Sequence, residues 1–501
     1  MISFRLHITI AFCLIWSGIS LQISAQSYYI AYDSLSKVIY DDIIDLKFKS
    51  AKIGLSQMEH SNPNNLARLH LENYMDFFLL FIHENENQFQ QLQKNKEKRI
   101  KIINDRIDDN DPYKKFILAE IHLHWAVIRA KFNQIFRAGR EIYSAYDLLK
   151  ENATEHPDFI YNKKSLSIIH SLIETITIPG LIKRMFGIKG SIELGVSEIT
   201  EVIEYSRSNP FIFEVEADAI YAFILFYQVN DKAKALSFID TCGLDHNKSL
   251  LANFLKAKFA QRSGFNEDAL AILEQRPQGD QYESFAYLDF LLGLGKLRKL
   301  DESAIQHFES FLFDFSGKHY IKEAYQKLAW CHLIFYDDIP KYKYFMSLVK
   351  EKGSKLIDDD KQAYKESMSL KVPDPTLLKA RLLFDGGYYE RANSLLTQKA
   401  YQYYSDPLVG LEYSYRMGRI SQALKNYPEA LKYFGSTINN GQLSNSYYAC
   451  NAALQMGIIY EEQNENEKSK KYYENCLKIN PEEYKTSLHQ KAKSGLARLK
   501  K

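Results

Sequence analysis

The amino-acid sequence predicts an all-α protein, a right-handed helical solenoid built from stacked antiparallel helix pairs. Three observations support this prediction. Small residues recur at nearly constant spacing through the C-terminal half of the chain, which is typical of repeated helix pairs. Twelve prolines and 22 glycines are few for 501 residues, which favours helix over a β-sandwich or disorder. No stretch alternates apolar and polar residues between hairpin turns, so no strand is expected.

The clearest unit lies at Cys450–Pro481, where two short helices flank a polar turn. Its first helix matches the W-x2-L-G-x2-Y spacing of a tetratricopeptide repeat, and its second helix matches A-x3-F with a terminal proline. The matching positions are Ala453, Met456, Gly457 and Tyr460, then Ser469, Tyr473, Cys476 and Pro481. Small residues let the two helix backbones approach, and the proline ring ends the second helix. The unit is therefore tetratricopeptide-like.

The small position recurs in the second helix of each predicted pair, four residues before a large apolar residue. The small positions are Ala235, Ala269, Ala304, Lys341, Ala392, Ala430 and Ser469. The large residues are Ile239, Leu273, Phe308, Phe345, Leu396, Phe434 and Tyr473. The steps are 34 to 39 residues, apart from one of 51 after Lys341, which is also the one member that is not small. We expect at least six helix pairs from about Phe213 to Pro481, with Ala430 buried between its two helices.

These patterns divide the chain into five parts. In order they are a signal peptide (1–25), an irregular helical-repeat region (26–212), central tetratricopeptide-like repeats (213–352), a joint (353–375) and C-terminal repeats (376–501). The joint holds an extra helix-like segment that ends at Pro373 and Pro375. A polar segment at Tyr484–Leu499 is expected to cap the array as its last helix.

Residues 1–25 have the layout of a secretory signal peptide. Arg5 supplies a positive charge, Leu6–Trp16 forms an apolar core, and Ile23-Ser24-Ala25 offers a cleavage site. The core is short for a bilayer span, which favours cleavage over an uncleaved anchor. No later segment is apolar enough to cross a membrane. We expect an exported protein, periplasmic or associated with the outer membrane, with no stable membrane span after signal cleavage.

The charges nearly balance: 64 Lys and Arg against 62 Asp and Glu give +2. Neither nucleic acid nor an anionic membrane is therefore expected as a partner. The one basic run, Lys94–Lys101, lies in a polar helical segment and is predicted to be a solvated face.

Four cysteines remain outside the signal segment: Cys242, Cys331, Cys450 and Cys476. Their wide spacing excludes a zinc ribbon or a C-x-x-C motif. Only Cys450 and Cys476 are expected to be neighbours, because they lie at adjoining ends of two antiparallel helices. Export would permit a disulfide between them, but so few cysteines in a long chain favour two buried free thiols.

The segment Ile178–Ile203 combines a proline and a basic stretch with an F-G-x-x-G turn, and a helix then begins with an acidic residue, leucine and glycine. The positions that carry this pattern are Pro179, Phe186, Gly187, Gly190, Glu193, Leu194 and Gly195. The block resembles the tetratricopeptide repeat protein 39 family, the inclusion-body-clearance group, which also has irregular helices before it and regular repeats after it. The resemblance implies a helical-repeat protein without enzymatic motifs. The export signal departs from that family, whose members act inside cells.

In physical terms, Gly187 and Gly190 predict a sharp connection between helices. A phosphate cradle is an alternative, but no strand precedes the turn and the G-x-x-x-x-G-K-[ST] spacing is missing. The amphipathic stretch Ile168–Ile188 could also lie on a membrane surface, which the near-neutral charge of the chain disfavours.

No catalytic constellation stands out, since H-E-x-x-H, G-x-S-x-G and glycine-rich nucleotide motifs are all missing. Glu120 and His124 are four residues apart and could bind a metal, but a hydrogen-bonded surface pair is the commoner arrangement. His122 falls on a different helix face from His124. We therefore expect no enzyme activity, no metal ligands and no cofactor.

The C-terminal first helices offer candidate partner-binding residues. Residues away from the packing face are expected to line the concave side of the solenoid. Two stripes follow with i, i+4, i+7 spacing, namely Tyr415, Arg419 and Gln422, and Leu454, Ile458 and Glu461. A mixed aromatic, basic and amide stripe suits capture of an extended or helical peptide. An ordinary solvated stripe that partly faces the core is the alternative.

These observations predict a non-catalytic, exported helical-repeat scaffold that binds a protein or peptide partner through its concave face. The alternative is an extracytoplasmic solute- or glycan-binding protein of the outer-membrane helical-repeat type. Such proteins share the export signal and the repeats, but carry a lipobox cysteine and a tryptophan-rich platform. Here Phe12 precedes Cys13, which argues against lipid modification, and only Trp125 and Trp330 remain after signal removal.

Overall fold

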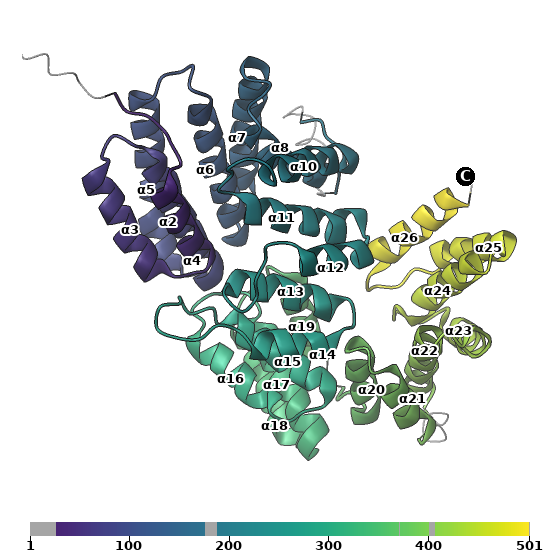
Figure 1. The fold of residues 1–501 in the computed structure, drawn as a ribbon. Helices are drawn as coiled ribbons and strands as arrows, with labels where there is room; N and C mark the ends of the chain where they lie inside the picture. Colours follow the sequence, from purple (N-terminus) through teal and green to yellow (C-terminus); the bar gives the residue numbers. More distant parts are fainter. Residues whose placement is uncertain (1–26, 176–187, 370, 400–405, 500–501) are drawn as a thin grey trace, which may run out of the picture.

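The computed structural model describes residues 27–175, 188–369, 371–399 and 406–499. Over these residues the protein forms 24 α-helices and one π-helical segment, η1. These ranges contain no strand, only an isolated parallel bridge between Tyr29 and Asn65. Neighbouring helices pack against one another along the chain (Figure 1), which confirms the all-α helical solenoid. The predicted signal peptide lies outside the described residues.

The N-terminal region is an irregular bundle of long helices. They are α2 (Ser34–Ile44), α3 (Phe48–Ser61), α4 (Ala67–His83), α5 (Glu86–Arg106), α6 (Pro112–Lys131), α7 (Ile135–Glu155), α8 (Tyr161–Thr175) and α10 (Ile192–Ser206). α6 packs along α7, and α8 packs along α10. Asp111 begins α6 by accepting a hydrogen bond from the backbone N–H of Tyr113, and Pro112 fits the first turn because its missing N–H has no helical partner.

Seven helix pairs follow in the described chain, which confirms the predicted series. They are α11 (Glu214–Phe223), extended by η1 (Ile224–Val229), with α12 (Lys232–Thr241); α13 (Leu250–Arg262) with α14 (Asn266–Glu274); α15 (Tyr287–Lys299) with α16 (Ala304–Asp314); α17 (Ile321–Tyr336) with α18 (Ile339–Glu351); α20 (Pro375–Asp385) with α21 (Tyr389–Thr397); α22 (Pro407–Ala423) with α23 (Tyr427–Gly441); and α24 (Tyr448–Glu462) with α25 (Asn466–Lys478). An extra helix, α19 (Asp358–Met368), lies in the segment predicted to be a joint, and α26 (Lys485–Arg498) follows the last pair.

Small residues hold the two helices of a pair together. Ala430 is fully buried, as predicted, and so is Ser469. The facing glycine of the first helix lets the large residue rest on its backbone: a Cβ added to Gly418 would lie 2.6 Å from the Phe434 ring. A Cβ on Gly457 would meet the ring of Tyr473 at the same distance. Close backbone approach therefore explains the small positions that recur in the sequence.

The register predicted for α18 is wrong by one residue. Lys341 is exposed, whereas Tyr342 and Met346 are buried. The physical reason is the extra helix α19, which packs beside this pair. The Tyr342 hydroxyl reaches α19 and donates a hydrogen bond to Glu366 at 3.3 Å, so a large side chain takes the place of the usual alanine.

The basic run Lys94–Lys101 also differs from its predicted solvated face. Lys96 is buried and its Nζ donates to Glu141 of α7 at 2.8 Å. Arg99 is buried as well and donates to Asp76 of α4 at 2.7 Å. Part of the polar face of α5 therefore lies inside the bundle, where acidic side chains of two other helices meet it.

The array bends back on itself beyond α19, because α20 packs against α15 and α17. The turn after α20 touches the turn after α13, and a Cβ on Gly387 would lie 2.0 Å from the carbonyl oxygen of Gly264. The Tyr388 hydroxyl donates to Glu267 at 2.8 Å and accepts from Asn266 at 2.9 Å. A solenoid whose repeats contact only their neighbours would leave these turns apart.

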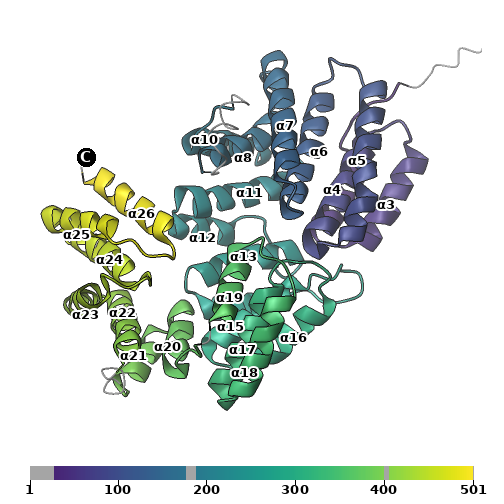
Figure 2. The ribbon, with the colours of Figure 1, turned by 180° about the vertical axis from the view of Figure 1, so that it is seen from behind.

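The bend brings the last helix towards the first pairs, and α26 lies beside α12 in both views (Figures 1 and 2). The pKa of Lys232 on α12 is lowered by burial, by Arg262 and by Lys491 of α26. Lys365 of α19 lies 2.7 Å from Glu483, just before α26. We call the surface formed by the first helices α13, α15, α17, α20, α22 and α24 the inner face.

The block that resembles the tetratricopeptide repeat protein 39 family is described in part, since Pro179, Phe186 and Gly187 lie outside the described residues. Gly190 and Gly195 lie where α10 approaches α8. A Cβ on Gly190 would be 2.7 Å from the Cα of His170, and one on Gly195 would be 2.6 Å from the Ser167 carbonyl oxygen. These two glycines therefore permit close approach of two helices.

Cys450 and Cys476 are buried and their Sγ atoms lie 3.6 Å apart, which confirms their predicted proximity; that both are free thiols stays a prediction.

Replacement of Ala430 by leucine tests the helix-pair contact. Ala430→Leu adds side-chain volume where none is free, so we expect a loss of about 1–3 kcal/mol in unfolding free energy. Urea unfolding followed by circular dichroism measures it. The exposed neighbour Lys432 serves as the control, and Lys432→Leu should change stability by less than about 0.5 kcal/mol. Equal effects of both changes would contradict the packing described here.

Glu84 joins the N-terminal bundle to the central repeats, and we expect the stability contributed by this contact to be lost at low pH. Its carboxylate binds Lys131 and lies 3.0 Å from Nδ1 of His319. Burial raises the pKa of Glu84, but His319 and Lys131 outweigh it and lower the pKa from 4.5 to about 2. The contribution to stability is thus present above pH 4.5 and is lost as the pH falls towards 2. We expect Glu84→Gln to lose about 3 kcal/mol at pH 7. Denaturant titrations at pH 7 and pH 3 should show a clearly smaller gap at pH 3; a constant gap would refute the assignment.

Candidate functional site

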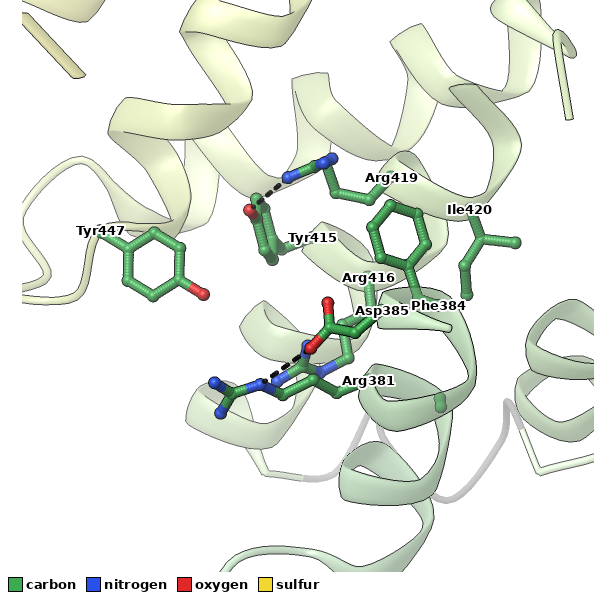
Figure 3. Close-up of a pocket in the computed structure, with 9 residues that line it drawn as sticks. Arg381, Phe384, Asp385, Tyr415, Arg416, Arg419, Ile420 and Tyr447 are labelled. Atoms are coloured by element: carbon green, nitrogen blue, oxygen red, sulfur yellow. Dashed lines mark hydrogen bonds and ion pairs between the residues drawn. The ribbon is translucent and has the colours of Figure 1, made fainter. Parts of the chain in front are cut away.

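A cavity of about 130 Å³ opens on the inner face between α20 and α22 (Figure 3). Its lining residues are Ala380, Arg381, Phe384 and Asp385 from α20, Tyr415, Arg416, Arg419 and Ile420 from α22, and Tyr447 at the start of α24. Aromatic rings, three guanidinium groups and one carboxylate therefore border a single space.

Tyr415 and Arg419 are held in a fixed arrangement in this cavity. The Tyr415 hydroxyl lies 2.6 Å from the Asn451 amide nitrogen, which donates to it, and 3.2 Å from Nη1 of Arg419. The Arg419 guanidinium also lies 5.0 Å from the centre of the Phe384 ring, within range of a cation–π interaction. Both described partners of Arg419 are neutral, so its charge is not cancelled locally.

Arg381 presents an accessible guanidinium. Its Nε lies 3.8 Å from the Asp385 carboxylate, beyond hydrogen-bonding distance, and its side chain is 39% exposed. Arg416 differs, because its side chain is 12% exposed and binds Glu412. Arg381 can therefore offer several N–H groups to a ligand, while Arg416 is already engaged.

Arg381 and Asp385 also line a larger recess of about 460 Å³. Its other walls include Arg298 of α15, Trp330 of α17 and Asp359 of α19. The Trp330 ring is covered, with Lys327 Nζ 4.0 Å and the Arg381 guanidinium 5.2 Å from its centre. The cavity and the recess share α20, and together we call them the inner groove.

Burial and neighbouring charges determine the protonation states of the tyrosine and arginine side chains that line the groove. Burial raises the pKa of Tyr447 far above 10, so this hydroxyl stays neutral. Burial also lowers the pKa of Arg381, but Asp385 and other neighbours outweigh this effect and raise it overall. Guanidinium groups keep their charge at all ordinary pH values. The groove thus combines a neutral hydroxyl donor with permanent cations.

The structure brings only some of the predicted residues together. Tyr415 and Arg419 line the cavity, whereas Gln422 lies half-buried near the end of the same helix and does not line it. The second stripe does not join the first. Leu454 is 1% exposed in the core, and Ile458 packs beside that core. Glu461 is bound by Arg498 of α26 at 2.7 Å.

Arg298, Trp330 and Arg381 were not among the predicted site residues, although the repeat register contains a signal for them. Arg419 directly follows Gly418, the small residue of its first helix. Arg381 and Trp330 hold the same position, directly after Ala380 and Ala329. Aligning the first helices on their small residues would therefore have placed these side chains on the wall that bears Arg419. In α15 the position directly after the small residue Gly293 is Leu294, and Arg298 lies one helical turn after Leu294.

A second polar centre lies buried in the N-terminal bundle around Lys164 of α8. Its Nζ donates to Glu120 at 2.6 Å, to Glu216 at 2.8 Å and to the Tyr74 hydroxyl at 3.1 Å. The Tyr40 hydroxyl donates to Glu216 at 2.9 Å. Burial lowers the pKa of Lys164, but Glu120 and Glu216 outweigh it and raise it overall. The ammonium is therefore charged and fully paired.

Glu120 and His124 do not form the surface pair that their spacing predicted. Both are buried, and His124 is hydrogen-bonded through Nδ1 to Asn73 at 2.9 Å. Burial lowers the pKa of His124 to about 4, so the ring is neutral at pH 7. Their partners come from α4 and α8, which an i, i+4 spacing cannot reveal. Among the described residues, no group of three His, Cys, Asp or Glu could hold a metal ion.

None of the helices in the described part of the chain is long and apolar enough to cross a membrane. No protein-family model matches the chain, and a search of curated proteins finds no match either.

Replacement of Lys164 by an uncharged residue should strongly destabilise the protein. Lys164→Met leaves Glu120 buried without its partner, so we expect a loss of about 3–5 kcal/mol in unfolding free energy. The adjacent Lys163 is a matched control, because it pairs with Glu201 at the surface. Lys163→Met should cost less than about 1 kcal/mol. Chemical denaturation of both variants makes the comparison, and similar losses would show that burial of the ion pair is not the cause.

Proposed function

We propose that the protein is a non-catalytic, exported helical-repeat scaffold that binds a protein or peptide partner through its inner groove. The observation that carries this proposal is the pair of adjoining spaces on the inner face, which share the accessible guanidinium of Arg381. Kinship with the tetratricopeptide repeat protein 39 family, and a periplasmic or outer-membrane-associated location, belong to the same proposal. They rest on the block Ile178–Ile203 and on residues 1–25.

The chemistry of the groove supports a polypeptide partner. Planar guanidinium groups bind carboxylates through paired hydrogen bonds. The neutral hydroxyl of Tyr447 and the ring of Phe384 offer hydrogen bonding and apolar contact beside them. Side chains of these types are enriched where proteins bind one another.

The position of the tryptophans disfavours the glycan-binding alternative. Trp125 is 2% exposed and Trp330 is 3% exposed. A buried ring cannot stack on a sugar without rearrangement of the helices around it. We therefore place the solute- or glycan-binding function second.

Recovery of partners from the exported fraction tests the proposed function. The bait is the chain with a C-terminal tag, and bound proteins are quantified by mass spectrometry. We expect a partner that the wild type retains to fall at least tenfold with the double variant Arg381→Glu/Arg419→Glu. Lys470→Glu, an exposed change on α25, is the control and should retain it. Equal recovery by the double variant and the wild type would rule out the groove as the binding site.

A further inference from the structure

Three cations, Lys258, Arg262 and Arg298, act on one another electrostatically, and Arg298 lines the recess of the inner groove. Lys258 Nζ is hydrogen-bonded to the Tyr287 hydroxyl at 2.7 Å. Arg298 Nη1 donates only to the Gln261 carbonyl oxygen at 3.4 Å, a long contact. Arg262, one turn after Lys258 on α13, lies 5.9 Å from the Tyr227 ring. These hydrogen-bond and ring partners are neutral, so any compensation of the cations comes from carboxylates at longer range, namely Glu323, Asp359 and Asp385.

The three cations also repel one another. The pKa of Lys258 is lowered to about 8, first by burial and then by Arg262 and Arg298, although Glu323 and Asp359 act in the opposite direction. Burial and Arg262 likewise lower the pKa of Arg298, against the effect of Asp385 and Glu323. An acidic side chain that approaches these cations would be attracted to them, although Glu323, Asp359 and Asp385 already offset part of their charge.

The start of α19 adds acids to the lining of the same recess. Asp358 is 94% exposed and contacts only Lys361, a neighbour on the same helix, at 2.8 Å. Asp359 is exposed and lines the recess as well. Glu323 also lines the recess, but it is already paired with Lys327, whose Nζ lies 3.2 Å from its carboxylate. The recess is therefore lined by the guanidinium groups of Arg298 and Arg381 from α15 and α20, by Asp385 beside Arg381, and by carboxylates from the start of α19.

We propose that this recess binds a peptide segment of mixed charge, with an acidic side chain held by Arg298 and Arg381 and a basic side chain held by Asp358 and Asp359. This inference rests on the proposed function and names the class of partner. The volume of about 460 Å³ lies within the usual range of ligand clefts, about 300–1,000 Å³. Because the guanidinium groups and the α19 carboxylates come from different helices, they also favour one direction for the segment.

A ligand of uniform charge fits this recess less well. A sulfated glycan or a nucleic-acid strand would place anions against Asp358, Asp359 and Asp385, and like charges in apposition oppose binding. A purely basic segment would meet Arg298 and Arg381. Only a segment that carries both signs matches both groups of side chains.

Selection from a phage-displayed library of random 12-residue peptides tests the proposal on the full chain. We expect peptides enriched on the wild type to combine at least one acidic with at least one basic residue. On the Asp359→Lys variant, whose altered site is exposed, enriched peptides should keep the acidic residue and lose the basic one. Affinity for a wild-type-selected peptide, measured by fluorescence anisotropy, should fall at least tenfold in Arg298→Gln and in Asp359→Lys. The Lys470→Gln control should leave it unchanged.

Several results would overturn the inference. One is no enrichment on the wild type above the double variant Arg298→Gln/Arg381→Gln. Others are enriched peptides without acidic residues, or unchanged charge preference on Asp359→Lys. Displacement of the selected peptide by a heparin oligosaccharide at equal concentration would instead indicate a general anion site. If enriched peptides show no preference for combined acidic and basic residues, while Arg381→Glu/Arg419→Glu still loses the natural partner, the inference fails and the proposed function stands. If the enriched peptides do show this preference but the double variant retains the natural partner, the proposed function fails and the inference about the recess stands.

Discussion

The buried ammonium of Lys164 determines how the N-terminal helices can be arranged. It meets Glu120, Glu216 and Tyr74, and Tyr40 completes the coordination of Glu216, so side chains from α2, α4, α6, α8 and α11 meet at one point. An apolar contact tolerates sliding, whereas a buried charge that loses a partner costs several kcal/mol. These five helices are therefore restricted to one relative arrangement. Because α11 begins the regular pairs, the same centre sets the direction in which the whole array starts.

The regular half of the fold was predictable because its packing is local. Ala430 and Phe434 lie one turn apart in one helix, and Phe434 contacts Gly418 of the helix just before it. A pattern of small and large residues records that contact directly. The prediction failed at Lys341, where the decisive contact is between Tyr342 and the extra helix α19.

The bundle could not be predicted in this way, because polar side chains pair across long stretches of sequence. Lys96 and Arg99 are hydrophilic and belong to a segment with the composition of a surface helix. They are buried because Glu141 and Asp76 lie opposite them on other helices. The same reason made Glu120 and His124 resemble a surface pair. Composition shows that such residues need polar partners, but not that the partners are inside the protein.

The candidate site was predicted in part, for a similar reason. Tyr415 and Arg419 follow from the face of a single helix, which spacing reveals. Leu454 has the equivalent spacing on α24 but is covered, and Glu461 is occupied by Arg498 of the helix that follows the last pair. The recess brings together α15, α17, α19 and α20, and this grouping depends on the bend after α19. No pattern within one repeat contains that bend.

The contact between Gly264 and Gly387 limits how this chain can change in length. Solenoids commonly grow or shrink by duplication or loss of whole repeats, since each unit touches only its neighbours. Here the turn after α13 and the turn after α20 lie backbone against backbone, although helices α14 to α20 separate them in the sequence. Tyr388 binds Asn266 and Glu267 across the two turns. A unit added or lost between α14 and α20 would displace one turn from the other and open the recess beside it. The number of helices in that interval is therefore fixed by geometry, and gene duplication within this protein is compatible with the fold only outside it.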